Sequence, residues 1–205
     1  MPPARDPASF DDLYTGIPLW DVGRAQEEFV ALADRSQIVP PVLDVGCGTG
    51  ENILEMAERG FEAAGIDAAP RAIGKAIDKA RERGLDVRFL VADALALATL
   101  GRRFRTVIDS GLFHVFDDEE RAVFAASVAD VLEPGGRYHL LCFSEHVPGE
   151  WGPRRVTQDE IRRTFDRGWR IAEIVETRFE TTLPDGAVRA WRATIERLPE
   201  AEGRD

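Results

Sequence analysis

Short apolar runs alternate along this chain with segments whose apolar residues recur at helical spacing. Two runs, Val42-Leu43 and Leu140-Leu141-Cys142-Phe143, are apolar on successive positions, as expected for strands buried on both faces. The pattern predicts strands over 42–46, 62–67, 86–91, 104–110 and 137–143, and helices over 52–59, 70–83 and 119–132. Such alternation is typical of βαβ units with right-handed crossovers, so it indicates a parallel sheet covered by helices on both faces.

The last third of the chain follows a different pattern. Thr157-Gln158-Asp159-Glu160 has the spacing of a capping box and predicts a helix over 158–165. Two long alternating runs, 169–183 and 187–198, are joined by Pro184-Asp185-Gly186, which favours a hairpin turn. We therefore expect an antiparallel hairpin to complete the parallel sheet, and a frayed tail over 199–205.

Length and charge narrow the possible functions. The chain has 205 residues, which suits one domain. It carries 26 Lys and Arg against 37 Asp and Glu, a formal net charge of −11, and its short basic pairs, Arg102-Arg103 and Arg154-Arg155, do not form a phosphate-binding track. We therefore expect no nucleic-acid partner and favour a small, neutral or apolar ligand.

Neither a membrane nor an oxidising compartment is expected. No apolar run approaches the roughly 20 residues that span a bilayer, and the first residues lack the features of a signal peptide. The two cysteines, Cys47 in a glycine-rich turn and Cys142 in a strand-like run, are not placed for a disulfide. These features favour a cytoplasmic protein, and the sequence gives no reason to expect a metal site.

The most informative motif is the glycine-rich segment that follows the first expected strand. In Val42-Leu43-Asp44-Val45-Gly46-Cys47-Gly48-Thr49-Gly50 an apolar run ends in three glycines at alternate positions, and a helix-spaced segment follows. Glycines allow backbone N–H groups to approach a ligand closely, and a helix start offers unpaired donors and a partial positive charge. The motif predicts a site for the polar tail of an adenosine-type cofactor.

Three carboxylates stand where successive predicted strands end. They are Asp67, Asp93 and Asp109. Ligands of open α/β sheets bind beyond the carboxyl ends of the strands, so these side chains are expected to point into one crevice. Asp67 is placed to accept both ribose hydroxyls, and Asp93 is placed to accept from an adenine amino group.

Together these segments resemble class I S-adenosylmethionine (AdoMet)-dependent methyltransferases. The resemblance rests on 43–50, on Gly65-Ile66-Asp67 and on Ala92-Asp93-Ala94, which are similar to the successive cofactor motifs of that class. It implies a three-layer αβα sandwich with a seven-stranded, mostly parallel sheet, in which the C-terminal hairpin inserts one antiparallel strand. It also implies a methyltransferase domain over 40–198.

Two further segments are similar to small methyltransferases of the thiopurine and heterocyclic-toxin type. They are Pro18-Leu19-Trp20-Asp21-Val22-Gly23-Arg24 and 109–116. This likeness implies an N-terminal helical cover over 1–39, with Trp20 near the sulfonium end of the cofactor. It also implies methyl transfer, by in-line displacement, to an S, N or O atom of a small aromatic or heterocyclic acceptor, in a monomer or homodimer.

Two alternatives to this enzyme remain open. A dinucleotide site places a glycine at the sixth position of its motif, whereas the sixth position counted from Gly46 is Glu51, which would repel a pyrophosphate. A catalytically silent AdoMet-binding or sensing module would keep the same cofactor motifs. Methylation of a macromolecule is disfavoured because Asp109-Ser110-Gly111-Leu112 lacks the proline-rich segment expected for amino groups on bases.

The expected site residues fall into three groups. Those expected to bind the cofactor are Trp20, Gly46, Cys47, Gly48, Gly50, Asp67, Ala68, Asp93, Ala94, Asp109 and Ser110. Those expected to border the acceptor are Tyr14, Phe113, Phe116, Phe143 and Trp151, with Phe10 nearby. His114 is the candidate general base, His146 competes with it, and His139 is expected to belong to the core.

Overall fold

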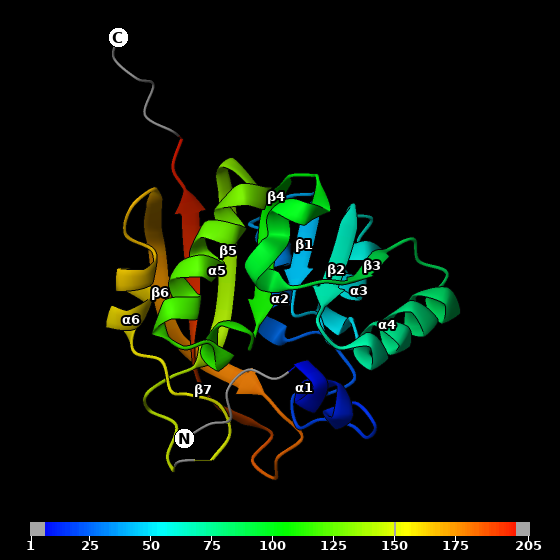
Figure 1. The fold of residues 1–205 in the computed structure, drawn as a ribbon. Helices are drawn as coiled ribbons and strands as arrows, with labels where there is room; N and C mark the ends of the chain where they lie inside the picture. Colours follow the sequence, from blue (N-terminus) through cyan, green and yellow to red (C-terminus); the bar gives the residue numbers. More distant parts are fainter. Residues whose placement is uncertain (1–6, 150, 200–205) are drawn as a thin grey trace.

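In the computed structural model, which describes residues 7–149 and 151–199, the strands form one seven-stranded sheet. Figure 1 shows these strands as arrows, with helices around them. The strand order is β3-β2-β1-β4-β5-β7-β6, with β7 antiparallel to both β5 and β6. Their bounds are β1 Val42–Val45, β2 Ala63–Asp67, β3 Arg88–Val91, β4 Phe104–Ser110, β5 Leu132–Phe143, β6 Trp169–Glu180 and β7 Ala187–Arg197. The expected fold class, with its antiparallel strand from the C-terminal hairpin, is confirmed.

Helices cover both faces of the sheet and complete three layers. Successive strand residues point to opposite faces, so Leu43 joins one apolar core while Val42 joins the other. One face packs against α5 and α6, and the other against α2, α3 and α4. The helices are α1 Pro7–Leu13, α2 Glu27–Asp34, α3 Glu51–Glu58, α4 Pro70–Arg83, α5 Asp118–Val131 and α6 Gln158–Thr164, with 3₁₀ turns η1 Ala94–Leu100 and η2 Phe113–Val115.

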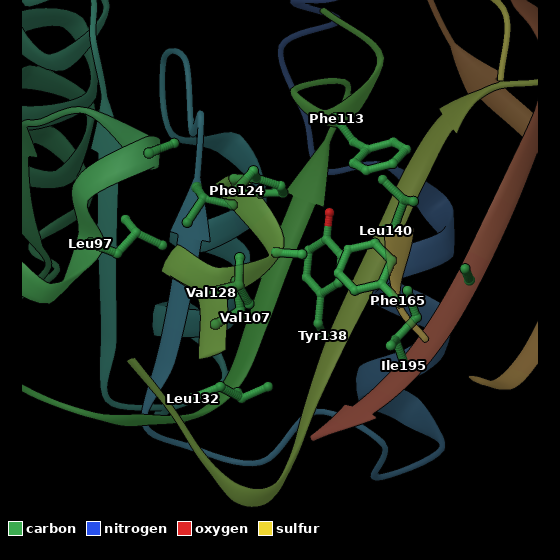
Figure 2. Close-up of a cluster of buried hydrophobic side chains, with 14 of the residues drawn as sticks. Leu97, Val107, Phe113, Phe124, Val128, Leu132, Tyr138, Leu140, Phe165 and Ile195 are labelled. Carbon is green, nitrogen blue, oxygen red and sulfur yellow. The ribbon is translucent and has the colours of Figure 1, made fainter. Parts of the chain in front are cut away.

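The core on the α5 and α6 side combines aliphatic side chains with a group of aromatic rings (Figure 2). Tyr138 of β5 lies 5.3 Å from the Phe165 ring and 6.0 Å from the Phe124 ring, measured between centroids. All three side chains are almost completely buried. Burying an aromatic side chain contributes on the order of 2–3 kcal/mol, so this core holds α5 and α6 firmly against β4 and β5.

Most element boundaries agree with the sequence analysis, and the predicted Thr157 capping box is confirmed. β5 is the main difference, because it begins at Leu132 instead of residue 137. Leu132 is fully buried and pairs with Phe104 of β4, so the chain enters the sheet directly from α5. The expected tail begins at 199, and residues 200–205 lie outside the described part of the chain.

Candidate active site at the carboxyl edge of the sheet

The glycine loop, residues 46–50, joins β1 to the start of α3. Gly48 has a φ of +55°, and a Cβ at this position would lie 2.9 Å from the Tyr14 Oη. A side chain here would therefore be both strained and obstructed. The Gly48 N–H donates to Oδ2 of Asp67 at 2.9 Å, which ties the loop to the end of β2. The sequence interpretation of this segment as strand, tight turn and helix is confirmed.

Asp67 connects the two strands on which the cofactor motifs lie. Its second oxygen, Oδ1, accepts from the Ala69 N–H at 2.8 Å. Burial raises the pKa of the carboxyl, whereas the backbone donors of Ala69, Gly48 and Ala68 oppose this. An ionised carboxylate accepts about four hydrogen bonds, so Asp67 retains acceptor capacity for a ligand's hydroxyl groups.

Asp44 was not among the expected site residues, yet it is the least satisfied acid in this region. It is completely buried, and neither carboxylate oxygen has a hydrogen-bond partner among the described residues. Burial raises its pKa, and the nearby Asp109 and Asp67 raise it further. A buried carboxylate without partners is costly unless a donor or cation reaches it. The signal was visible in the sequence as one acid inside an otherwise apolar strand.

Asp109 and Asp93 both organise the backbone around them. Asp109 accepts from the N–H groups of Leu112 and Phe113 and from the Tyr138 hydroxyl, at 2.7, 3.0 and 2.8 Å. It is fully buried, and burial raises its pKa to about 7. Asp93 caps η1 by accepting from the Leu95 N–H at 2.9 Å. Direct cofactor contacts by these two acids stay a prediction.

The other expected cofactor residues lie along the same edge. Ala68 and Ala94 follow the ends of β2 and β3, and Ser110 ends β4. Cys47 packs inside the glycine loop, where burial raises the pKa of its thiol well above the usual value. A thiol in that state is a weak nucleophile, so Cys47 shapes the turn and does not supply reactive sulfur.

The N-terminal segment lies directly over the glycine loop. The Trp20 Nε1–H donates to the Tyr14 Oη at 3.2 Å, and the two rings meet edge to face. Thr49 donates its hydroxyl proton to Asp21 at 2.9 Å, so this segment is bonded to the loop itself. Tyr14 is buried and Trp20 is 38% exposed. Both expected residues therefore sit beside the glycine loop, and the covering role of 1–39 stays a prediction.

A second group of rings, which we call the aromatic cluster, comprises His114, Phe143, Trp151 and Phe179. The ring centroid of Phe143 lies 4.9 Å from that of His114, 5.2 Å from that of Phe179 and 6.0 Å from that of Trp151. The cluster reaches the glycine loop through 111–112. A Cβ on Gly111 would touch His114 and Phe179, and one on Gly46 would touch Leu112.

His114 is held as a neutral imidazole. The Phe143 N–H donates to its Nδ1 at 3.1 Å, so the neutral ring carries its proton on Nε2. Burial, with smaller effects from Arg121 and Arg155, lowers its pKa to about 3. This environment favours a hydrogen-bond donor over a base, and the predicted role as general base stays a prediction.

Several other candidates lie apart from this cluster. Phe113 and Phe116 pack in the core against Phe124, which accounts for their complete burial, and acceptor contact by them stays a prediction. His139 is buried and bonded to Thr194 and to the Gln37 carbonyl, as expected for a core residue. The remaining candidate base, His146, pairs with Glu176, and Phe10 lies in α1 at the N-terminal segment.

Sequence reasoning missed Phe179 and Arg155. Phe179 is contributed by β6, and its neighbours come from residues far earlier in the chain. The sequence analysis treated Arg155 only as half of a short basic pair, whereas its guanidinium lies over the Phe143 and Trp151 rings, 5.7 and 5.2 Å from their centroids. No local sequence signal marks either contact.

The arrangement of sheet, glycine loop and strand-end acids is that of a class I methyltransferase. A family model described as a methyltransferase domain matches residues 42–136. A 2-heptyl-1-hydroxyquinolin-4(1H)-one methyltransferase of Mycobacteroides abscessus is 38% identical over 164 residues, covering 78% of this chain and 72% of that protein. The chain belongs to the AdoMet-dependent methyltransferases, and AdoMet is its cofactor.

Solved structures share this fold. One, described as "Conversion of a Disulfide Bond into a Thioacetal Group during Echinomycin Biosynthesis", is 34% identical with a TM-score of 0.87, and the match covers 96% of this chain and 94% of that one. The 1,6-didemethyltoxoflavin-N1-methyltransferase of Burkholderia thailandensis has the same fold, at 19% identity and a TM-score of 0.70, covering 94% and 87% of the two chains. Among the described residues, no helix is long and apolar enough to cross a bilayer.

Proposed function

We propose that this enzyme methylates an S, N or O atom of a small aromatic or heterocyclic acceptor. The observation that carries the proposal is the aromatic cluster, which lies one loop away from the glycine loop. Flat apolar rings with few polar groups are the surfaces that bind planar organic ligands. The named activities of the quinolone and toxoflavin methyltransferases, both on heterocycles, support the same class of acceptor.

The residues at the carboxyl edge fit AdoMet. Asp44 offers two buried carboxylate oxygens without protein partners, which suits a cationic group such as the ammonium of the methionine moiety. Asp67 would accept from the ribose hydroxyls, and the Gly48 N–H holds the glycine loop beside it. Tyr14 and Trp20 would cover the cofactor from the N-terminal segment.

The chain's own contribution to methyl transfer is placement. AdoMet supplies a methyl group already activated on a sulfonium. The aromatic cluster would hold the acceptor's plane, and the His114 Nε2–H would donate to a polar atom of the acceptor. Holding two reactants in a near-attack geometry gains roughly 7–11 kcal/mol in well-oriented intramolecular reactions. No residue needs to form a covalent bond with the acceptor.

Two measurements test the proposal. Isothermal titration calorimetry should show binding of AdoMet and of its demethylated product, AdoHcy. Incubation with methyl-labelled AdoMet and a panel of thiols, phenols and N-heterocycles, including 2-heptyl-1-hydroxyquinolin-4(1H)-one, should transfer label to at least one acceptor. Binding without any transfer would favour the silent binding module, and transfer only to protein or nucleic acid would contradict a small-molecule acceptor.

A further inference from the structure

Arg155 is a fixed cation beside the aromatic cluster. Its Nε–H donates to the Val147 carbonyl and its Nη2–H to the Gly149 carbonyl, both at 3.2 Å, and Nη1–H donates to the Pro153 carbonyl. These bonds use three of the five guanidinium N–H groups. The guanidinium is thereby held over the Phe143 and Trp151 rings, at 5.7 and 5.2 Å from their centroids.

The carboxylates near this loop are committed to other partners. Glu160 pairs with Arg121 and Arg154, and Asp118 pairs with Arg154. Glu145 accepts from the Trp191 indole at 2.6 Å, and Glu176 pairs with His146 and Arg189. Asp109 is occupied by two backbone N–H groups and the Tyr138 hydroxyl.

Among the described residues, no carboxylate lies within ion-pair distance of Arg155, and Glu150 lies outside them. The charge of Arg155 beside the aromatic cluster is therefore not neutralised by an ion pair within the described residues. Burial is the largest cause of the lowered pKa of His114, and the charges of Arg121 and Arg155 add to it.

In this cluster, His114 offers a hydrogen-bond donor and has no free lone pair that could accept a proton. Its Nδ1 lone pair is used by the Phe143 N–H, so the neutral ring presents Nε2–H. A cation and a neutral donor beside flat rings favour a planar ligand that carries negative charge.

We propose that the acceptor binds as an anion, as a planar aromatic or heteroaromatic compound whose nucleophilic O, S or N atom is already ionised, with its charge facing Arg155 and the Nε2–H of His114. This rests on the proposed function and names its substrate class. The ionised atom attacks the methyl carbon, the carbon–sulfur bond breaks and its electron pair returns to sulfur. The product is neutral, and no proton has to be removed by the protein.

The test uses 4-nitrophenol, whose ionised and neutral forms absorb differently. The dye is titrated into the AdoHcy-loaded protein, and its ionised fraction is followed across the pH range in which the free dye ionises. We expect the pKa of the bound dye to fall by at least about one unit, which means an anion bound about tenfold more tightly than the neutral form. The neutral analogue 4-nitroanisole should bind at least about tenfold more weakly than the anion.

Matched variants separate charge from loop structure. Arg155→Lys keeps the charge and should retain most of the shift, whereas Arg155→Gln keeps polar contacts but should abolish it. Arg189→Gln removes an exposed arginine paired with Glu176 and should leave the shift unchanged. Equal effects of Arg155→Lys and Arg155→Gln would assign Arg155 to loop structure alone and overturn the proposal.

A bound dye that ionises like the free dye, or a failure of the nitrophenolate to bind, would also contradict the anionic acceptor. AdoHcy binding measured on the same samples keeps the two proposals distinguishable. Loss of the dye shift with AdoHcy binding intact refutes only the anionic acceptor, whereas absence of AdoHcy binding refutes the proposed function.

Discussion

Replacing Asp67 with alanine should weaken cofactor binding more than any neutral change on the surface of α4. The side chain accepts from the Gly48 and Ala69 N–H groups, at 2.9 and 2.8 Å, and we propose that it also accepts from the cofactor ribose. A hydrogen bond to a charged group contributes about 1.5–3 kcal/mol. Losing the ribose contact therefore raises the Kd for AdoHcy by roughly 10- to 150-fold.

Calorimetric titration with AdoHcy measures this change directly. Asp67→Asn keeps one acceptor oxygen and the shape of the side chain, so its Kd should fall between those of the parent and Asp67→Ala. The control is Asp78→Ala, because Asp78 is 66% exposed and pairs only with Arg81 of the same helix among the described residues. It should leave the Kd unchanged. An unchanged Kd for Asp67→Ala would refute the assignment of Asp67 to the ribose.

Three further predictions concern the glycine loop and the buried histidines. Gly48→Ala and Gly60→Ala both place a side chain at positive φ, so each should lower the free energy of unfolding by about 1–2 kcal/mol. Only the new side chain at residue 48 meets Tyr14, so only Gly48→Ala should also weaken AdoHcy binding. Burial lowers the pKa of His139 to about 4. As the pH falls from 6.5 toward 4, His139 should therefore lower the free energy of unfolding by about 1.4 kcal/mol per pH unit, which urea unfolding measures. His114→Phe should slow phenol and thiol acceptors alike in methyl-transfer assays, because the neutral ring donates a hydrogen bond to both.

Each of these predictions has an outcome that contradicts it. Equal AdoHcy affinity in Gly48→Ala and Gly60→Ala would place the cofactor away from the covered loop. Stability falls with falling pH because the unfolded state binds a proton on His139 in this pH range and the folded state does not. The His139→Gln variant should therefore lose the contribution of His139 to the pH dependence of the unfolding free energy. If the unfolding free energy of His139→Gln depends on pH as steeply as that of the parent, other groups cause this dependence. Selective slowing of phenol acceptors in His114→Phe would support the predicted role of His114 as general base.

The glycine loop and the position of Asp67, where we propose that the cofactor binds, were largely predictable because their signals are local. The glycine spacing of 46–50 specifies a turn that only glycine backbone conformations allow, and Asp67 is identified by ending the next strand. Parallel βαβ connection then brings these strand ends to one edge without further information. Asp44 was missed although its place inside an apolar strand was visible in the sequence, and only the structure shows that both of its oxygens lack partners among the described residues.

The aromatic cluster, where we propose that the acceptor binds, depends on contacts between residues far apart in the chain. His114, Phe143 and Phe179 meet because β7 pairs with both β5 and β6, which brings the end of β6 near the end of β5. No local sequence pattern encodes these contacts. The sequence also could not show that Phe113 packs in the core near Phe124, and its predicted contact with the acceptor stays a prediction. The orientation of a side chain on a short 3₁₀ turn follows from the packing around it.

The sequence by itself determined the order of strands and helices, the glycine turn and the acids that end the strands, because propensity, periodicity and turn chemistry act over a few residues. Tertiary structure decided the protonation state of His114, the unsatisfied state of Asp44 and the charge beside the aromatic cluster. These properties arise from burial and from electrostatic interactions through space, and neither is defined until distant segments have packed together.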